Sequence, residues 1–417
     1  MKEVLSKIKP TNEEKKKFQS SVSSFLKKLN KELKDAKAVL GGSGAKDTYL
    51  SGSCDIDIFV LYPLKKYSPK THDLSNFLEK VLKKSFPHIT LSRLHGSRDY
   101  FQLFYEGYLI EVIPILKISK ASYALNITDI SPLHTKWVNA HAKKCKDDIR
   151  LVKQFCKAQG VYGAESYIGG FSGYVLEILV VAYGSFPKLL KASAHWKLKD
   201  VIDVAKHYPK KDALFHLNQS KTQSPLIVID PVDKSRNAAA ALSSEKLSLF
   251  CKKAKEFLQK PSLSFFEKRD FSLAKLQERT KKLKKHLIYI ELKPHEGKED
   301  VIGAKLAQAF HSLNSELEQF VVVESGWDFG KQKTIFYFIV KDHQLPAYEI
   351  RKGPPLSMVE FVEAFKKKNK NTYVEKGILY AKIARKETTL PLVVKKALTN
   401  SYISARIQKV IKIETSS

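Results

Sequence analysis

The feature that most constrains the fold of this chain is a turn of small residues followed by an apolar strand that begins with two aspartates. The turn covers residues 41–44, and a strand is expected over residues 56–62, directly after Asp55. Side chains two positions apart on a strand point to the same face of a sheet. Asp55 and Asp57 are therefore expected to lie side by side, with the apolar side chains that alternate with them facing a core.

The chemistry of this stretch indicates a phosphate site beside a metal site. Two adjacent carboxylates repel each other unless a cation lies between them, and Mg²⁺ binds carboxylate oxygens together with substrate phosphates. Gly42 allows backbone amides to approach a phosphate closely, and Ser43 adds a hydroxyl. A lone pair of aspartates is usually a solvated loop, but the joint pattern is typical of the DNA polymerase β-like nucleotidyltransferase superfamily.

A third carboxylate lies in another apolar strand, expected over residues 109–116, where Glu111 is the single charged residue. A carboxylate in such a strand is costly unless it lies at a sheet edge or binds something. If this strand pairs with the first, Glu111 joins Asp55 and Asp57 as ligands for two-metal phosphoryl transfer. The alternative is an edge carboxylate paired with a lysine.

The chain is strongly basic. Its 417 residues carry 73 lysines and arginines against 43 aspartates and glutamates, a formal net charge of +30. This charge favours a polyanionic partner, either nucleic acid or an anionic membrane. The longest apolar run, residues 174–183, is interrupted by Glu177 and is too short for a membrane span. We therefore expect a nucleic-acid partner and no membrane, with a merely solubilising excess of lysine as the alternative.

The cysteines favour a reducing compartment. Cys54, Cys145, Cys156 and Cys251 are scattered, without a C-x-x-C pair. This spacing indicates neither a zinc knuckle nor a disulfide framework. The N-terminal residues also lack the apolar core of a signal peptide. We expect a cytoplasmic protein.

Hydrophobic periodicity predicts a multidomain α+β chain. Helices are expected over residues 12–38, 74–84, 147–158, 169–186, 243–259, 300–317 and 358–368. Strands are expected over residues 90–94, 100–105, 226–229, 286–292, 320–324 and 334–340, with a hairpin over residues 372–381. In the helix over residues 147–158, Arg150, Lys153 and Lys157 are expected on the exposed surface.

Three regions are expected from this pattern and from the length of the chain. Residues 1–142 form a nucleotidyltransferase head, a mixed sheet with helices. Residues 143–260 form a largely helical central domain. After a boundary near Pro261, residues 261–417 form an α+β body and tail that bind RNA.

These pieces resemble the archaeal-type (class I) CCA-adding enzymes, which are tRNA nucleotidyltransferases, over nearly the whole chain. The resemblance rests on GGSGAKDTYLSGSCDIDIFVLYP and IEVIP in the head, and on SPLHTKW, IRLVKQFCKAQGVYGAE, GGFSGYVLEILVVAYGSF and DPVDKSRNAAAALS in the middle. The last three are far more specific than the superfamily motif and separate the family from poly(A) polymerases. In the last third the match is looser and rests mainly on RKGPP, residues 351–355.

The resemblance implies template-independent addition of C, C and A to the 3′ end of tRNA from CTP and ATP, with release of pyrophosphate. It also implies two Mg²⁺ ions on Asp55, Asp57 and Glu111, and a role in nucleotide recognition for the central domain, residues 143–260. The expected partner is the acceptor and T arms of tRNA, and a homodimer is expected as the family's frequent state. The residues expected to bind the nucleotide are Gly42, Ser43, Lys46, Ser131, His134, Lys153, Tyr162 and Arg236.

The physical properties of these residues agree with such roles, although each has a plainer interpretation. Lys153 suits a phosphate, and Arg236 presents several donors in a plane to a base edge, with Asp233 as a candidate to orient it. Outside the motifs, Lys153 would be a solvated lysine and Arg236 a surface residue. Likewise Tyr162 would be a packing residue and His134 a core histidine.

Departures from the family pattern leave two alternatives open. Glu111 stands where aspartate is usual, Lys46 where arginine is usual and Ser131 where threonine is usual; the His-Pro-Tyr segment expected before the third carboxylate is not recognisable. The first alternative is an enzyme that adds only part of CCA, or a poly(A)-type enzyme. The second is an RNA-binding protein whose head has lost activity.

Overall fold

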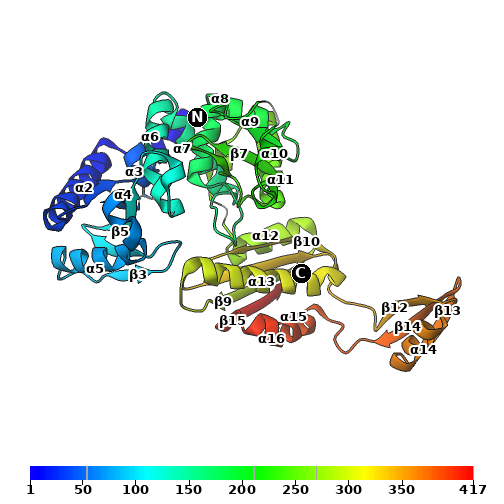
Figure 1. Cartoon of the computed structure of the whole chain (residues 1–417). Coiled ribbons are helices and arrows are strands. Elements are labelled where there is room, and N and C mark those ends of the chain that lie inside the picture. The colour runs from blue at the N-terminus through cyan, green and yellow to red at the C-terminus, as the bar shows by residue number, and fades with distance from the viewer. Residues whose placement is uncertain (53–54, 210–211, 269, 417) are drawn as a thin grey trace. The chain divides into compact units, whose positions relative to one another are not determined.

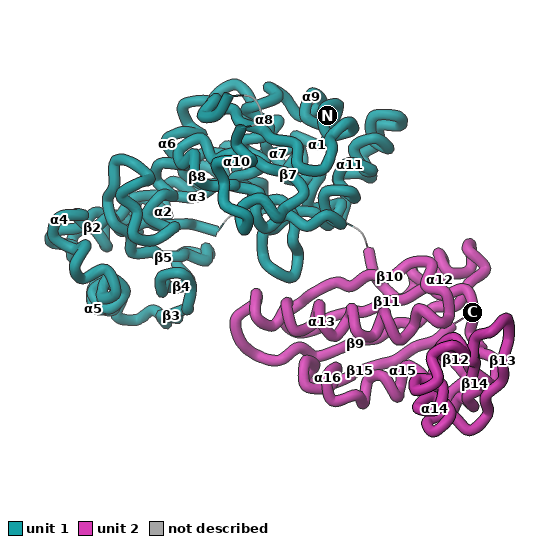
Figure 2. Tube along the Cα trace, turned by 45° about the vertical axis from the view of Figure 1, so that its right-hand side comes forward, with its two compact units in different colours: residues 1–269 teal, residues 270–417 magenta. Residues whose placement is uncertain are grey.

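The computed structural model describes residues 1–52, 55–209, 212–268 and 270–416, so Cys54 lies outside the described residues. The chain divides into two compact units, residues 1–269 and 270–417, coloured separately in Figure 2. The short 3₁₀-helix η5 (Leu263–Phe266) still packs within the first unit, because the rings of Phe265 and Phe266 contact that of Phe155. The division between head and central domain within the first unit stays a prediction.

The first unit begins with a five-stranded sheet in the order β1-β2-β5-β4-β3. Its strands are β1 (Lys37–Leu40), β2 (Ile56–Pro63), β3 (Ser92–Leu94), β4 (Tyr100–Tyr105) and β5 (Tyr108–Lys117). Strands β2 and β5 run parallel, and the other pairs are antiparallel. Helices α2 (Asn12–Glu32) and α5 (Leu74–Ser85) pack against this sheet and share a core with it. The apolar side chains of β2, which alternate with Asp57, belong to that core.

The first helix is shorter than the sequence predicts. A capping box between Thr11 and Glu14 starts α2, but the helix ends at Glu32. Residues 37–38 belong to β1, because their backbone pairs with β2. The small-residue turn also differs, since residues 42–46 form a short helix, α3 (Gly42–Lys46). At the C-terminal end of α2, strand pairing with β2 thus overrides the helical pattern of the sequence.

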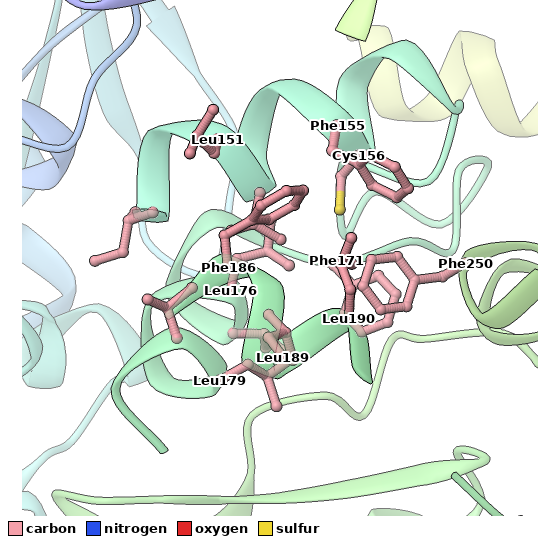
Figure 3. Packing of buried hydrophobic residues seen from close by; sticks show 14 of the residues in the cluster. Leu151, Phe155, Cys156, Phe171, Leu176, Leu179, Phe186, Leu189, Leu190 and Phe250 are labelled. Atoms are coloured by element: carbon pink, nitrogen blue, oxygen red, sulfur yellow. The ribbon is translucent and has the colours of Figure 1, made fainter. Parts of the chain in front are cut away.

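Helices around one large core make up the rest of the first unit (Figures 1 and 3). They are α1 (Lys2–Ile8), α6 (Ser131–His141), α7 (Lys146–Ala158), α8 (Gly173–Tyr183), α9 (Phe186–Ser193) and α11 (Ser244–Gln259). Two short helices pack elsewhere: α4 (Leu64–Tyr67) packs against the core of the five-stranded sheet, and α10 (Ala213–His216) contributes to a separate small core. A small sheet joins β6 (Asp200–Ile202), β7 (Leu226–Asp230) and β8 (Asp233–Asn237). Two residues of the types that favour helix ends bound α8: Ser172 caps its start and Gly184 ends it in the left-handed conformation.

The exposed surface predicted for α7 is wrong for two of its three cations. Arg150 is 1 % exposed and Lys153 is 3 % exposed. Arg150 donates hydrogen bonds to Asp147 and to Asp47, and Lys153 contacts Glu177. A helix period shows which positions share a face but not how many faces neighbouring elements cover. Here α7 is buried nearly all round.

The second unit contains two sheets. The larger has the order β10-β11-β9-β15, formed by β9 (His286–Lys293), β10 (Val322–Asp328), β11 (Thr334–Val340) and β15 (Lys409–Ser416). Helices α13 (Glu299–Leu317), α15 (Leu390–Thr399) and α16 (Ser401–Ser404) contribute to one of its cores, and α12 (Leu273–Leu283) contributes to another. The predicted helix over residues 300–317 and the strand over residues 334–340 are confirmed, whereas β15 and α15 were not predicted.

The smaller sheet has the order β12-β14-β13, with β12 (Tyr348–Pro355), β13 (Thr372–Glu375) and β14 (Ile378–Ala384). Helix α14 (Val359–Lys368) contacts β12. The predicted hairpin is confirmed, and its turn places both Lys376 and Gly377 at positive φ.

No single helix of the described chain is long and apolar enough to cross a membrane. Helices α8 and α9 together satisfy a criterion of length and composition, with a bend of 94° between them. Both helices supply residues to the large core of the first unit, including Leu176, Leu179, Leu189 and Leu190 in Figure 3.

Candidate active site

The parallel pairing of β2 and β5 places two of the predicted carboxylates directly beside each other. Asp57 and Glu111 are register partners, and Asp55 comes one residue before β2. The alternative of an edge carboxylate is wrong for Glu111, because β5 lies between β2 and β4. Its hydrogen-bond partner is an amide, Gln102 Nε2 on β4, at 2.6 Å from Glu111 Oε1.

The start of α3 lies against this acidic group. A Cβ atom at Gly42 would lie 1.6 Å from Asp57 Oδ2, and Gly42 has a φ of +54°. Both facts require glycine at this position. The amide of Gly41 donates to the carbonyl of Asp57 at 2.7 Å, which ties the turn to β2. The backbone that was predicted to contact a phosphate is therefore held beside the carboxylates.

The carboxylates repel each other. Burial raises the pKa of Asp57 to about 7, with the charges of Glu111 and Asp55 adding to the increase and Lys46 opposing it. Burial and Asp55 also raise the pKa of Glu111, against the hydrogen bond from Gln102. Such repulsion is relieved by a bound cation. Among the described residues, however, no group of three or more His, Cys, Asp or Glu side chains is arranged so that it could hold a metal ion.

Two lysines predicted to bind the triphosphate converge on one buried carboxylate. Lys46 Nζ lies 2.8 Å from Glu177 Oε2, and Lys153 Nζ lies 2.8 Å from Glu177 Oε1. Thr48 donates to Glu177 Oε1 at 2.7 Å. The Glu177 residue is 1 % exposed. Because two ammonium groups share one carboxylate, this lysine pair has an excess of positive charge that favours an anion.

The charges of this group hold one another in place. Burial acts to raise the pKa of Glu177, but the charges of Lys153 and Lys46 and their hydrogen bonds lower it to about 2. Burial lowers the pKa of Lys153, and Glu177 opposes that change. Glu177 is therefore ionised at neutral pH, as its two partners require.

Tyr162 borders the same group at the start of α8. A Cβ atom on Gly173 would lie 3.0 Å from the Tyr162 hydroxyl and 3.7 Å from Lys153 Nζ. On the other side, Lys157 Nζ lies 5.3 Å from the centre of the Tyr162 ring. Burial lowers the pKa of Lys157, and the charge of Asp55 opposes it, so this lysine lies within electrostatic reach of the carboxylates.

A second buried carboxylate, Asp230, organises the residues predicted to contact the nucleotide base. Arg236 Nη1 donates to Asp230 Oδ2 at 2.6 Å, and His134 Nε2 lies 3.0 Å from the same oxygen. The Tyr174 hydroxyl donates to Asp230 Oδ1 at 3.0 Å. Burial acts to raise the pKa of Asp230. The hydrogen bond and charge of His134, the backbone amide of Val232 and the charge of Arg236 together lower this pKa to about 2.

The partner predicted for Arg236 is therefore wrong. Asp233 accepts hydrogen bonds from the amide and hydroxyl of Ser235, which stabilise the β7–β8 turn. Asp230 orients Arg236 instead, because the antiparallel hairpin brings the end of β7 beside β8. His134 is 12 % exposed at its side chain and lies on α6 one turn after Ser131.

Five residues of this site were not predicted from the sequence: Thr48, Gln102, Tyr174, Glu177 and Asp230. Two of them carried a signal. Glu177 is the single charge in the apolar helix α8, and Asp230 ends the fully buried strand β7. An ionisable side chain in an apolar segment needs a charged or hydrogen-bonding partner. The lysines and the arginine of the sequence motifs were the candidates, and they are the partners in the structure.

Comparison with protein families gives three matches along the chain. A model described as "Nucleotidyltransferase domain" matches residues 22–103. One described as "tRNA nucleotidyltransferase, second domain" matches residues 147–267. A third, described as "CCA-adding enzyme, C-terminal domain", matches residues 284–414.

Curated relatives match over most of their length. A CCA-adding enzyme of Nanoarchaeum equitans is 37% identical, covering 89% of this chain and 90% of the relative. The CCA-adding enzyme of Pyrococcus abyssi is 34% identical over 85% of this chain and 80% of its own. That of Methanosarcina mazei is 30% identical over 97% of this chain and 90% of its own.

Solved structures show a shared fold. The crystal structure of the Cid1 poly(U) polymerase bound to MgGTP is 16% identical with a TM-score of 0.51, and the match covers 64% of this chain and 97% of the polymerase. At this identity the likeness concerns the fold alone.

Proposed function

We infer that this protein works as a tRNA nucleotidyltransferase, because the chain belongs to the family of CCA-adding enzymes. It adds C, C and A to the 3′ end of tRNA and uses CTP and ATP as substrates. The observation that best supports this function in the structure is the register pairing of Asp57 with Glu111 beside a turn that only glycine can form.

Nucleotidyltransferases use divalent metal ions. We propose that Asp55, Asp57 and Glu111 hold two Mg²⁺ ions, with the two aspartates as shared ligands. The donor set fits, because Asp57 and Glu111 are adjacent and the negative charge of neighbouring carboxylates raises the pKa of each. Mg²⁺ commonly takes only one or two carboxylates and completes its coordination with water and substrate phosphates. Glu111 exchanges its hydrogen bond to Gln102 for this role.

The reaction is an in-line displacement at the α-phosphate. A bond forms between the tRNA 3′-oxygen and the α-phosphorus, the bond to the bridging oxygen breaks, and pyrophosphate leaves. The ions, when bound, favour the deprotonated 3′-hydroxyl and neutralise the leaving pyrophosphate. Lys46 and Lys153 bind the phosphates of the incoming nucleotide, with Ser43 and Tyr162 as further donors. Glu177 contacts both lysines and so directs them at the same site.

Arg236 and His134 face the base and sugar of the incoming nucleotide. The guanidinium presents several donors in one plane, which suits the edges of cytosine and adenine. The Asp230 carboxylate fixes both residues, so the protein offers the same contacts at each step. Ser131, one turn before His134 on α6, adds a hydroxyl. The base is thus selected without a nucleic-acid template.

The protein binds tRNA, and we propose that the second unit contacts the acceptor and T arms. Its helices α12 and α14 end in lysines, including Lys281, Lys282 and Lys366–Lys368. A-form RNA is recognised mainly by shape and backbone, which suits such a surface. We also propose that the protein acts in the cytoplasm and forms a homodimer. Sedimentation with and without tRNA tests the homodimer.

The deciding experiment is incorporation onto a tRNA transcript that ends at the discriminator base. The transcript is incubated with Mg²⁺ and CTP alone, ATP alone, or both. Two cytidines from CTP alone, and CCA from both, are expected. Addition of C alone under all conditions would indicate an enzyme for part of the sequence. Salt-sensitive tRNA binding without any addition would indicate an RNA-binding protein with an inactive head.

A further inference from the structure

Tyr174 lies between the two charged groups of the site. Its hydroxyl donates to Asp230 Oδ1 at 3.0 Å, and its ring stacks on that of His134 with centroids 4.0 Å apart. On the phosphate side, Lys46 Nζ lies 5.3 Å from the centre of the same ring. One side chain thus contacts both the group around Asp230, which we propose to bind the base, and one of the two lysines that share Glu177.

Helix α8 extends this connection. Tyr174 and Glu177 are three positions apart on α8, so they lie on neighbouring parts of the same helix face. Glu177 binds Lys46 and Lys153. Lys46 therefore contacts α8 twice, through the carboxylate of Glu177 and through the ring of Tyr174. The position of Lys46 therefore depends on the same turn of α8 that, through the Tyr174 hydroxyl, positions Asp230.

The hydroxyl of Tyr174 acts as a donor throughout the working pH range. Burial and the charge of Asp230 raise its pKa far above the ordinary value. Asp230 accepts from Tyr174 on one oxygen and contacts Arg236 and His134 on the other. A carboxylate held on both oxygens has a fixed plane, and this fixes the direction of the Arg236 guanidinium.

We propose that Tyr174 is a positioning residue that couples base selection to phosphate binding. The inference rests on the proposed function of the site and deepens it. CTP and ATP share a triphosphate but differ in base size. An enzyme that reads both in one site needs its base contacts held at a fixed separation from its phosphate contacts. Tyr174 supplies that separation, with its hydroxyl on one side and its ring on the other.

Two substitutions separate the hydroxyl from the ring. Tyr174→Phe keeps the stacking on His134 and the contact with Lys46, but removes the hydrogen bond to Asp230. Tyr174→Leu removes the ring as well. The matched control is Tyr183→Phe, on the same helix, whose hydroxyl accepts from Trp196 Nε1 at 3.0 Å and lies outside the described site contacts.

Two measurements report on the two sides. The first is the ratio of kcat/KM for CTP to that for ATP, on tRNA lacking its tail and on tRNA ending in CC. The second is the inhibition constant of inorganic tripolyphosphate, which has no base. Circular dichroism and the melting temperature show whether each variant is folded. If Tyr174→Leu does not fold, Tyr174→Met replaces it, because methionine also lacks the ring and fills a similar volume.

Tyr174→Phe is expected to reduce the discrimination between CTP and ATP by about tenfold, the effect of losing a hydrogen bond to a charged group, with unchanged inhibition by tripolyphosphate. Tyr174→Leu is expected to reduce discrimination and to weaken tripolyphosphate inhibition by about fivefold. Tyr183→Phe is expected to change neither. Unchanged discrimination in Tyr174→Phe, or unchanged inhibition in the folded Tyr174→Leu or Tyr174→Met variant, overturns the coupling. A wild-type protein that adds no nucleotide overturns the proposed function itself, so the two failures are distinguishable.

Discussion

Asp57 on β2 and Glu111 on β5 are register partners in a parallel pair of strands, so two carboxylates face the same side of the sheet at adjacent positions. Strands that are distant in sequence thus build an acidic site that neither could form alone. Burial raises the pKa of both groups, and the charge of a neighbouring carboxylate adds to it: Glu111 for Asp57, and Asp55 for Glu111.

Asp57→Asn is expected to lower nucleotide incorporation by at least about a thousandfold, because an amide cannot replace a shared carboxylate ligand of the metal ions. tRNA affinity is expected to stay unchanged, since the substitution removes no contact to RNA. Incorporation assays and filter binding check the two effects. Asp35→Asn, which removes an exposed ion pair with Lys66, is the control and should leave both unchanged. Normal turnover in Asp57→Asn would refute the metal assignment.

Glu111→Asp is expected to be tolerated or to increase the rate. The shorter side chain restores the residue that is usual in the family and loses its reach to Gln102, which competes for the carboxylate. Single-turnover incorporation at several Mg²⁺ concentrations measures this effect. Glu111→Gln serves as the inactive reference. An inactive Glu111→Asp variant would show that the site has been rebuilt around the longer side chain.

Glu177→Gln is expected to destabilise the protein by about 3 kcal/mol at pH 7, because it leaves two buried ammonium groups without their carboxylate. Folding lowers the pKa of Glu177 from 4.5 to about 2. Its contribution is therefore fully present above pH 4.5 and is lost as the pH falls toward 2. Urea unfolding of the wild type and the variant should show a difference that shrinks over this range.

A surface substitution provides the control for that series. Glu278→Gln removes an exposed pair with Lys282 on α12 and should leave the unfolding curve unchanged at pH 7. If Glu177→Gln behaved like Glu278→Gln, the buried carboxylate would not be holding the lysine pair.

Arg236→Ala is expected to lower incorporation and to blur the choice between C and A. Arg236→Lys should recover charge but not base choice, because an ammonium group lacks the planar set of donors. Sequencing the added nucleotides in mixtures of CTP and ATP measures this directly. Lys234→Ala, an exposed neighbour on β8, is the matched control. Unchanged rate and base choice in Arg236→Ala would remove this arginine from the site.

The affinity for tRNA is expected to fall steeply with salt. A chain with a net charge of +30 releases counterions when it neutralises RNA phosphates. The logarithm of Kd plotted against that of the KCl concentration should therefore be linear, with a large slope. A flat plot would contradict a backbone-dominated interface.

Much of the fold could be predicted from periodicity and punctuation in the sequence. Strand β4, strand β11 and the caps of α8 match the structure, because alternation, Ser172 and Gly184 are local signals. The end of α2 could not be predicted. The hydrophobic pattern predicts a helix as far as residue 38. In the structure the helix ends at Glu32, and residues 37–40 form β1, which pairs with β2.

The site was only partly predictable, for a physical reason. Motifs identified the residues that we propose to face the substrate, such as Asp57, Lys153 and Arg236. They did not identify the residues that hold them, because Glu177 and Asp230 act through contacts between distant segments. The burial of Lys153 depends on the same contacts, so a helix pattern alone placed it on the surface.

The sharing of Glu177 by two lysines also bears on turnover. In the function that we propose, any phosphate that binds Lys46 and Lys153 competes with a carboxylate that is covalently part of the protein. When pyrophosphate is formed, the same carboxylate is ready to take its place. The protein thus contains its own displacing anion, which limits how tightly the by-product is retained and leaves the lysines ready for the next nucleotide.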